Sequence, residues 1–189
     1  MLHIITRAYR YHLLDRVYDS IPKLEDITWH IGKSSRRESL THNFIEDKRV
    51  IVYEVDCDDS DITPKTNKIL DKITDGYFCF LDDDTYFYDN MYYAYQKFQK
   101  QNFINMIIGQ QLFKNMVLKI MKPSIPIKGS IDIANVLCHH SLIKDIRFQI
   151  ENEENKGCKD YFFWKEIFEK NNNSAFPIMS VLSIHNGFR

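Results

Sequence analysis

The sequence predicts an α/β fold with a mainly parallel sheet flanked by helices. Short apolar runs rich in β-branched and aromatic residues alternate with segments of helical periodicity through the first half of the chain. The most apolar of these runs, residues 76–81, leads directly into Asp82, Asp83 and Asp84. Ligands of parallel α/β sheets bind beyond the carboxyl ends of the strands, so the acidic triplet lies where a ligand site is expected.

The expected elements of the first half alternate between strand and helix. Leu14, Val17 and Ile21 recur at helical spacing. Thr63 is expected to cap a helix that has Pro64 in its first turn. In chain order the elements are a strand at 2–6, a helix at 11–21, strands at 27–31 and 49–55, a helix from 63 to about 73, a strand at 76–81 and a helix that Asp89 caps.

The second half of the chain is less regular. Residues 122–130 have the proline- and glycine-containing composition of a loop. Residues 131–143 are ambiguous between strand and helix, whereas 160–170 carries an apolar stripe at helical spacing. Strands are expected at 103–109 and 117–121. Because the chain has 189 residues and no internal repeat, we expect one domain, spanning 1–189.

The composition excludes several classes of protein. With 25 Lys and Arg against 26 Asp and Glu, the chain has no excess of positive charge to attract nucleic acid. No window of about 18 apolar residues occurs, so no transmembrane segment is expected. The four cysteines lack CxxC spacing and are expected as reduced thiols, which favours a soluble, cytoplasmic protein.

Three consecutive carboxylates after an apolar strand are costly to desolvate unless a cation compensates them. Mn²⁺ or Mg²⁺ suits such a site, because these ions take oxygen ligands and keep positions open for substrate phosphates. Asp82 and Asp84 are the expected functional pair. The alternative is a solvated loop whose aspartates cap helices.

The segment GYFCFLDDDTYFYDN resembles the strand and DxD motif of GT-A-type glycosyltransferases, whose Rossmann-like sheet binds a nucleotide sugar. IITRAYR resembles the first strand and loop of that family, which implies that Thr6, Arg7 and Tyr9 lie beside the base and ribose. Thr66-Asn67 falls where many members have Arg-Asn, with Lys65 as a substitute cation. The resemblance implies a nucleotide-sugar-binding half at 1–100 and an acceptor-binding half at 101–189.

Later segments resemble the remaining motifs of the family. Lys159-Asp160-Tyr161 resembles the acidic start of a late helix, which implies that Asp160 is the general base. His185 resembles a metal-binding histidine, and Gly129 to Asp132 resembles the acceptor-side loop. The residue types alone also permit a helix cap at Asp160 and a structural role for His185. The implied site comprises Asp160 as base; Thr6, Arg7, Tyr9, Lys65, Asn67, Asp82 and Asp83 for the donor; Asp132 and Trp164 for the acceptor; and Asp82, Asp84 and His185 for the metal.

The resemblance implies an inverting, metal-dependent transfer of a sugar from a nucleoside diphosphate sugar to a glycan or other hydroxyl acceptor. The stretch ITWHIGKSS stands where many members have Asp-Asp-Gly-Ser, which leaves UDP-sugar and GDP-sugar open as the donor. Two alternatives remain: a nucleotidyltransferase-like protein, and an inactive glycan-binding protein of the same fold. The absence of a glycine-rich phosphate loop near Thr6 speaks against the nucleotidyltransferase.

Overall fold

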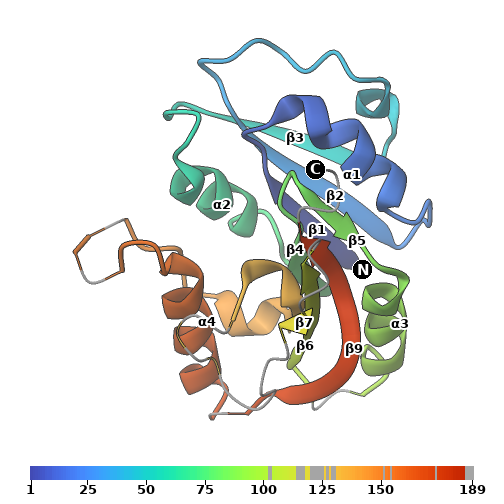
Figure 1. The fold of residues 1–189 in the computed structure, drawn as a ribbon, viewed down its shortest axis with the longest axis vertical. Helices are drawn as coiled ribbons and strands as arrows, with labels where there is room; N and C mark the ends of the chain where they lie inside the picture. Colours follow the sequence, from blue (N-terminus) through green and yellow to red (C-terminus); the bar gives the residue numbers. More distant parts are fainter. Residues whose placement is uncertain are drawn as a thin grey trace.

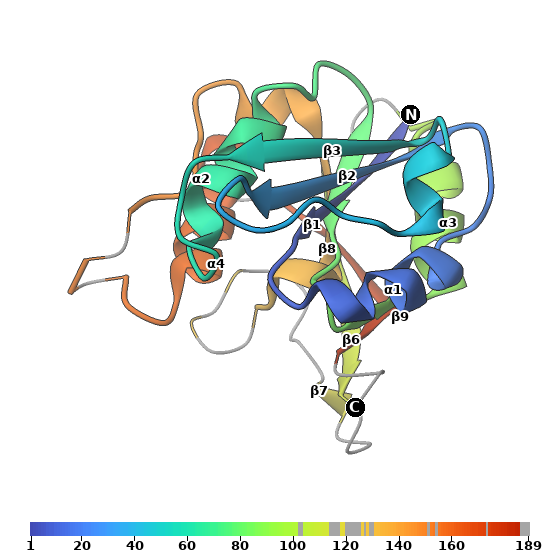
Figure 2. The same cartoon turned by 90° about the horizontal axis from the view of Figure 1, so that it is seen from above.

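One mixed β-sheet runs through the molecule, with helices on both of its faces (Figures 1 and 2). The computed structural model describes residues 1–101, 104–113, 118–119, 126, 128, 131–150, 152–153, 155–172 and 174–185. The strands are β1 (Leu2–Arg7), β2 (Ile27–Ser34), β3 (Val50–Val55), β4 (Tyr77–Phe80), β5 (Thr85–Phe87), β6 (Met106–Phe113), β7 (Leu118–Lys119), β8 (Val136–His139) and β9 (Phe176–His185). Their order is β3-β2-β1-β4-β8-β6-β9-β5, with β7 beside β6.

The half of the sheet formed by β3, β2, β1 and β4 is parallel, as predicted from the alternation of strands and helices. Strand β1 lies between β2 and β4, with Leu2 opposite Ile27 on one side and Tyr77 on the other. Since all four strands point the same way, their carboxyl ends meet at one edge of the sheet. Arg7 at the end of β1 and the aspartates after β4 share that edge.

The other half of the sheet is mixed. The ambiguous segment 131–143 forms a short 3₁₀ turn at Ile133–Asn135, then β8, then a second 3₁₀ turn at His140–Ile143. Strand β8 pairs antiparallel with both β4 and β6, whereas β9 runs parallel to β6 and antiparallel to β5. Strands β5 and β9 were not predicted from the sequence.

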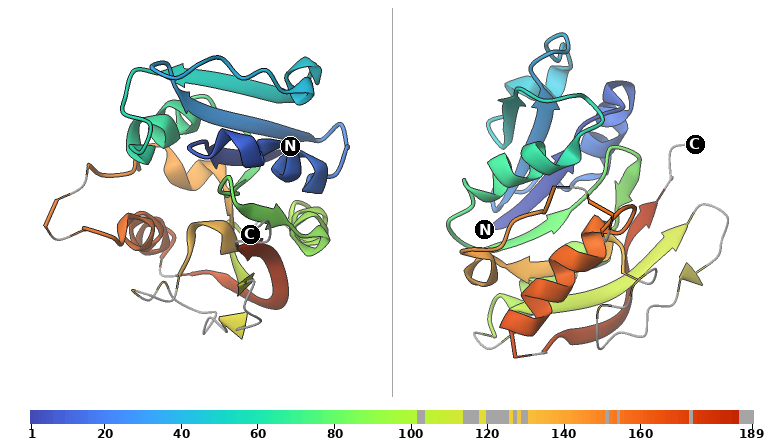
Figure 3. Two further views of the ribbon diagram at one scale, coloured as in Figure 1. Left: turned by 45° about the horizontal axis from the view of Figure 1, so that its top comes forward. Right: turned by 90° about the vertical axis from the view of Figure 1, so that its left-hand side faces the viewer.

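Two hydrophobic cores separate the sheet from its helices. Helices α1 (Leu14–Ser20) and α3 (Asp89–Phe98) cover one face, and α2 (Ile62–Leu70) and α4 (Lys159–Lys170) cover the other (Figure 3). Alternate residues along β4 and just beyond its end pack into the two cores: Cys79 and Leu81 lie in the core beneath α1 and α3, whereas Phe78 and Phe80 lie in the core beneath α2 and α4. This burial on both faces explains why the run 76–81 is continuously apolar.

Several predicted boundaries were wrong by a few residues. The expected helix at 11–21 begins as a 3₁₀ turn and becomes α-helical only at Leu14. The cap of α2 is Asp61, whose carboxylate accepts from the backbone N–H of Thr63 at 3.1 Å, so Pro64 lies in the third position. The strand expected at 103–109 is shifted to 106–113. Most of the loop expected at 122–130, including Gly129, lies outside the described residues.

A chain of side-chain hydrogen bonds through the buried His3 and His30 crosses the parallel half of the sheet. His3 Nε2 lies 3.0 Å from Asp75 Oδ1, His3 Nδ1 lies 2.9 Å from His30 Nε2, and His30 Nδ1 lies 3.0 Å from the Tyr53 hydroxyl. Burial, reinforced by the neighbouring His3, lowers the pKa of His30 to about 3. Burial also lowers the pKa of His3, against the opposing effect of Asp75. The two imidazoles are therefore neutral at physiological pH.

Cys57, Cys79, Cys138 and Cys158 carry free thiols, and all but Cys158 are buried. Burial raises the pKa of the Cys79 and Cys138 thiols, which keeps them protonated. In the part of the chain that the structure describes, no helix combines the length and the apolar character needed to cross a membrane.

Candidate active site

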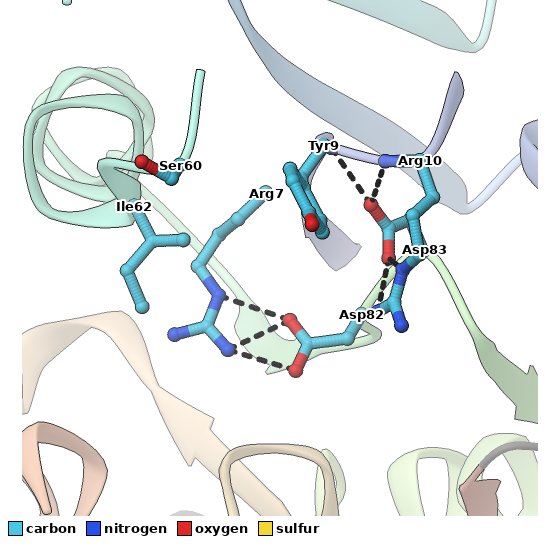
Figure 4. A pocket seen from close by; sticks show the side chains of 7 residues that line it. All are labelled: Arg7, Tyr9, Arg10, Ser60, Ile62, Asp82 and Asp83. Atoms are coloured by element: carbon cyan, nitrogen blue, oxygen red, sulfur yellow. Dashed lines mark hydrogen bonds and ion pairs between the residues drawn. The ribbon is translucent and has the colours of Figure 1, made fainter. Parts of the chain in front are cut away.

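Arg7 and Asp82 form a two-pronged ion pair at the carboxyl ends of β1 and β4 (Figure 4). Arg7 Nε and Nη2 donate to Asp82 Oδ1 at 3.0 and 2.7 Å, and Nη2 also donates to Oδ2 at 2.9 Å. The two strand ends are held in register by Thr6, whose hydroxyl donates to the Leu81 carbonyl at 2.7 Å. The desolvation of buried Arg7 is outweighed by Asp82 and Asp160, so its pKa is raised and the guanidinium stays charged.

Asp160 accepts a hydrogen bond from the same guanidinium group as Asp82, that of Arg7. It is in the first turn of α4, and its Oδ1 accepts from Arg7 Nη1 at 3.2 Å. Burial raises the pKa of Asp160 to about 6; Arg7 opposes this shift, and the nearby carboxylates of Asp82 and Asp132 reinforce it. The side chain remains 30% exposed, so a ligand can reach it. A reachable carboxyl group with a pKa near 6 has the properties of a general base.

Asp83 anchors the loop between β1 and α1. Its Oδ2 accepts from the backbone N–H groups of Tyr9 and Arg10 at 2.7 and 2.6 Å, and its Oδ1 accepts from Arg10 Nε at 2.7 Å. The carboxylate is only 2% exposed and is surrounded by these donors. Its position favours a structural role in shaping the loop over the direct donor contact that the sequence predicted.

Asp84 and His185 approach each other through the pairing of β5 with β9. Thr85 lies opposite His185 in that antiparallel pair, which places His185 Nδ1 3.7 Å from Asp84 Oδ1. The other carboxylate oxygen of Asp84 accepts from Arg10 Nη1 at 2.7 Å. The sheet topology thus brings together two of the three side chains predicted to bind metal, although they are 101 positions apart.

The donor set at this edge fits a hard divalent cation in chemistry and in charge. It offers the carboxylates of Asp82 and Asp84 and the imidazole of His185. The four carboxylates of the site outnumber the guanidinium groups of Arg7 and Arg10, so the site as a whole carries excess negative charge. Within the described residues, no three His, Cys, Asp or Glu side chains are gathered as a finished metal site. Asp82 is turned toward Arg7 instead.

A pocket of about 200 Å³ opens beside the Arg7–Asp82 pair. Figure 4 shows that residues at or just after the ends of β1 and β4 line one side of it and that Ser60 and Ile62, just before and at the start of α2, line the other. The lining residues are Arg7, Tyr9, Arg10, Ser60, Ile62, Asp82 and Asp83. The pocket therefore combines cationic, acidic and aromatic groups, as a binding site for a polar ligand requires.

Of the other residues predicted to contact the donor, only Tyr9 lines this pocket, and the residue is 48% exposed. Thr6 is fully buried, and its hydroxyl both donates to the Leu81 carbonyl and accepts from the Trp29 indole N–H at 2.8 Å. Lys65 is also fully buried, with Nζ donating to the carbonyls of Ala8 and Asp59. The expected ligand contacts of Thr6 and Lys65 are therefore replaced by contacts that hold the strand ends and loops together.

Asn67 and Trp164 serve packing in this structure. The Asn67 amide donates to the backbone carbonyl of Phe148 at 3.0 Å, and its oxygen accepts from the Phe148 N–H at 2.9 Å. Trp164 is 0% exposed and packs against Phe78 and Phe80. In this structure Trp164 therefore belongs to the core, as large apolar side chains on the inner face of a helix usually do, and the acceptor contact expected of it stays a prediction.

Asp132 accepts from the backbone N–H of Ala134 at 3.2 Å and caps the 3₁₀ turn before β8. Its carboxylate is close enough to Asp160 to raise the pKa of that residue. The predicted acceptor residue and the predicted base therefore lie in the same region.

Ser60 and Ile62 are pocket residues that the sequence did not single out, whereas Arg10 lies with other basic residues at a predicted strand end. Arg10 has a signal in the sequence, because it lies three residues beyond Arg7 in the loop after the first strand. Ser60 and Ile62 follow β3 at the same sheet edge, yet their side chains carry no chemical signature.

Among the comparisons with known proteins, the one with solved structures gives information on the fold. No protein-family model and no curated protein sequence matches the chain. Among solved structures, that of TarS from S. aureus, a GT-A-type glycosyltransferase, matches with a TM-score of 0.73 at 14% identity. The structures of TarS 1-349 with UDP and with UDP-GlcNAc match with TM-scores of 0.71 and 0.69, at 14% and 13% identity.

Each match covers 97% of this chain but only 36% of the TarS chain, or 59% and 57% of the two complexed chains. The chain thus spans between about a third and three fifths of the length of these proteins. At this level of identity the likeness establishes the fold. The chain has the mixed α/β fold of GT-A-type glycosyltransferases.

Proposed function

We propose that this protein transfers a sugar from a nucleoside diphosphate sugar to a hydroxyl group of a glycan or other acceptor, with inversion at the anomeric carbon. The observation that carries the proposal is the position of Arg7, which holds Asp82 after β4 and Asp160 on α4 at one sheet edge. One guanidinium thereby joins the carboxylate expected at the donor to the carboxylate expected to act as base. Both face the edge where α/β sheets bind their ligands.

In this proposal Asp160 accepts the proton of the acceptor hydroxyl while that oxygen bonds to the anomeric carbon. The bond between this carbon and the diphosphate oxygen breaks, and the leaving nucleoside diphosphate takes the electron pair. A pKa of about 6 leaves Asp160 mostly ionised at neutral pH and makes it a stronger base than an ordinary aspartate. The nearby Asp132 is proposed to bind sugar hydroxyl groups.

Asp82, Asp84 and His185 are proposed to hold Mn²⁺ or Mg²⁺. When bound, the ion supplies positive charge that stabilises the departing diphosphate. Asp83 holds the loop that carries Tyr9 and Arg10, and this loop forms a wall of the pocket. The complexes of TarS with UDP and UDP-GlcNAc support a uridine nucleotide as the first donor to test.

The first test is isothermal titration of the purified chain with UDP, GDP and their sugars, with and without Mn²⁺. Metal-dependent binding of one nucleotide would support the proposal and identify the donor base. Release of the nucleoside diphosphate from the sugar donor, followed over time, then tests for turnover. A folded sample that binds none of these compounds would overturn the proposal and favour the glycan-binding alternative.

The metal assignment has its own test. Replacing Asp84 or His185 with alanine should weaken Mn²⁺ binding by roughly 10- to 100-fold or more, because each change removes a ligand or its close partner. Replacing His42, which pairs with the exposed Asp15 at 3.0 Å, provides a matched histidine control outside the site. Unchanged Mn²⁺ affinity in both Asp84 and His185 variants would remove the assignment.

A further inference from the structure

Arg7 binds the carboxylate of Asp82, which the proposed function assigns to a divalent metal ion. Both oxygens of Asp82 accept from the Nε–Nη2 edge of Arg7. A carboxylate engaged in this way has a cation already, and a second cation must compete with the guanidinium for the same oxygens. The state described by the structure is therefore closed toward a metal ion at Asp82.

The contacts on the rest of the Arg7 side chain do not depend on Asp82. Nη1 donates to Asp160 at 3.2 Å, and the guanidinium carbon lies 5.8 and 5.9 Å from the ring centroids of Phe80 and Phe148. These three groups come from α4, β4 and the segment before α4. They hold the guanidinium in place if Asp82 turns away, so that the Nε–Nη2 edge would face the pocket that Arg7 lines.

The same edge of a guanidinium binds a phosphate as well as it binds a carboxylate, because both present two oxygens at matching spacing. A nucleoside diphosphate in the pocket can therefore replace Asp82 on Arg7 without leaving the guanidinium unpaired. The displaced Asp82 is then released to a divalent cation that accompanies the diphosphate. The exchange leaves both Arg7 and Asp82 paired with a group of opposite charge before and after binding.

We propose that Arg7 is a latch, which holds Asp82 in the ligand-free protein and exchanges it for the diphosphate of the donor. The metal and the nucleotide then bind cooperatively, because each releases the group that the other requires. In the bound state Arg7 connects the diphosphate to Asp160, which places the base relative to the leaving group. This inference rests on the proposed function, and it adds the order of events at its site.

The latch predicts effects of opposite sign on two affinities. In Arg7→Gln, Mn²⁺ without nucleotide should bind roughly fivefold or more tightly than in the wild type, because Asp82 no longer has a competing cation. In the same variant, UDP at saturating Mn²⁺ should bind roughly tenfold or more weakly, because the phosphate loses its guanidinium. Titration calorimetry measures the nucleotide, and the electron paramagnetic resonance signal of free Mn²⁺ measures the metal.

Arg147→Gln is the matched control, since Arg147 donates through Nε to Asp71 at 2.8 Å at the other end of α2. It should leave both affinities unchanged. If Arg7→Gln does not fold, Asp82→Asn provides a second measurement: the neutral amide releases Arg7, so UDP without metal should bind more tightly than to the wild type.

Mn²⁺ affinity that is unchanged or weaker in Arg7→Gln would overturn the latch, and so would metal-free UDP binding to Asp82→Asn no tighter than to the wild type. Failure of the proposed function has a different signature. In that case neither the wild type nor any variant binds a nucleoside diphosphate, while the Mn²⁺ measurement still decides whether Arg7 competes for Asp82.

Discussion

Asp82 and Asp160 share one guanidinium, since Arg7 donates to Oδ1 of both carboxylates. One of these aspartates follows a buried strand and the other begins a helix 78 positions later in the chain. Because both carboxylates contact Arg7, replacing one residue of this group at a time tests the separate role proposed for each.

Replacing Asp160 with asparagine should lower the rate of sugar transfer roughly 100-fold or more, because the amide cannot accept the acceptor proton. Donor affinity should change much less. In the wild type the rate should rise with pH through about 6, where Asp160 loses its proton. Steady-state release of nucleoside diphosphate measures both effects, with the exposed Asp145→Asn as control. Wild-type rates in Asp160→Asn would exclude Asp160 as the base.

The same variant should be more stable than the wild type at pH 7 and similar to it at pH 3.5. The pKa of Asp160 is about 6 in the folded protein and 3.8 as its ordinary value. The folded protein therefore favours the protonated carboxyl group of Asp160. The resulting contribution to stability is fully present below about pH 3.8 and is lost as the pH rises through 6. Thermal unfolding at the two pH values measures the difference. A variant less stable than the wild type at pH 7 would contradict the raised pKa.

Asp83→Asn should lower the free energy of unfolding by roughly 2–4 kcal/mol, because it removes the buried charge on which Tyr9, Arg10 and their loop depend. Chemical denaturation measures this loss, and Asp145→Asn should change stability by less than about 0.5 kcal/mol. If the variant keeps full stability but loses nucleotide binding, Asp83 contacts the donor directly, as the sequence predicted.

His30 should make the protein sensitive to acid. Its pKa is about 3 in the folded protein and 6.5 as its ordinary value, so its contribution to stability is present above pH 6.5 and is lost as the pH falls toward 3. Between pH 7 and pH 5 this loss amounts to about 2 kcal/mol by linkage. In His30→Gln the loss over the same interval should be smaller. A stability profile as steep as that of the wild type would show that other groups cause the acid sensitivity.

The sequence was sufficient to predict the parallel half of the sheet, because strands buried on both faces are apolar throughout and helices between them keep their periodicity. It also predicted that Asp82 and the aspartates beside it lie at the carboxyl end of a strand. Strand β9 was missed because its burial follows no simple alternation: residues near its start are exposed, and Leu182 and Ser183 are consecutive buried residues.

Some predicted site residues could be identified from the sequence, whereas the contacts of others depend on the folded structure. Residue type and position in the chain singled out Asp82, and the resemblance to GT-A-type glycosyltransferases added Arg7 and Asp160; the structure brings these three residues into contact. Whether a polar side chain faces a ligand or a neighbouring carbonyl depends on the folded structure. For this reason Thr6 and Lys65, chosen with the same reasoning, were found to be buried supports.

The insertion of β9 between β6 and β5 has a consequence for how the protein folds. Strand β5 pairs only with β9 in the described sheet, so Thr85 finds its partner His185 100 positions later in the chain. The parallel strands β1 to β4 can pair early, but such long-range closure is slow and leaves strand edges open to aggregation in the meantime. Because His185 lies at the end of β9, this candidate metal ligand reaches Asp84 only once β9 has paired with β5.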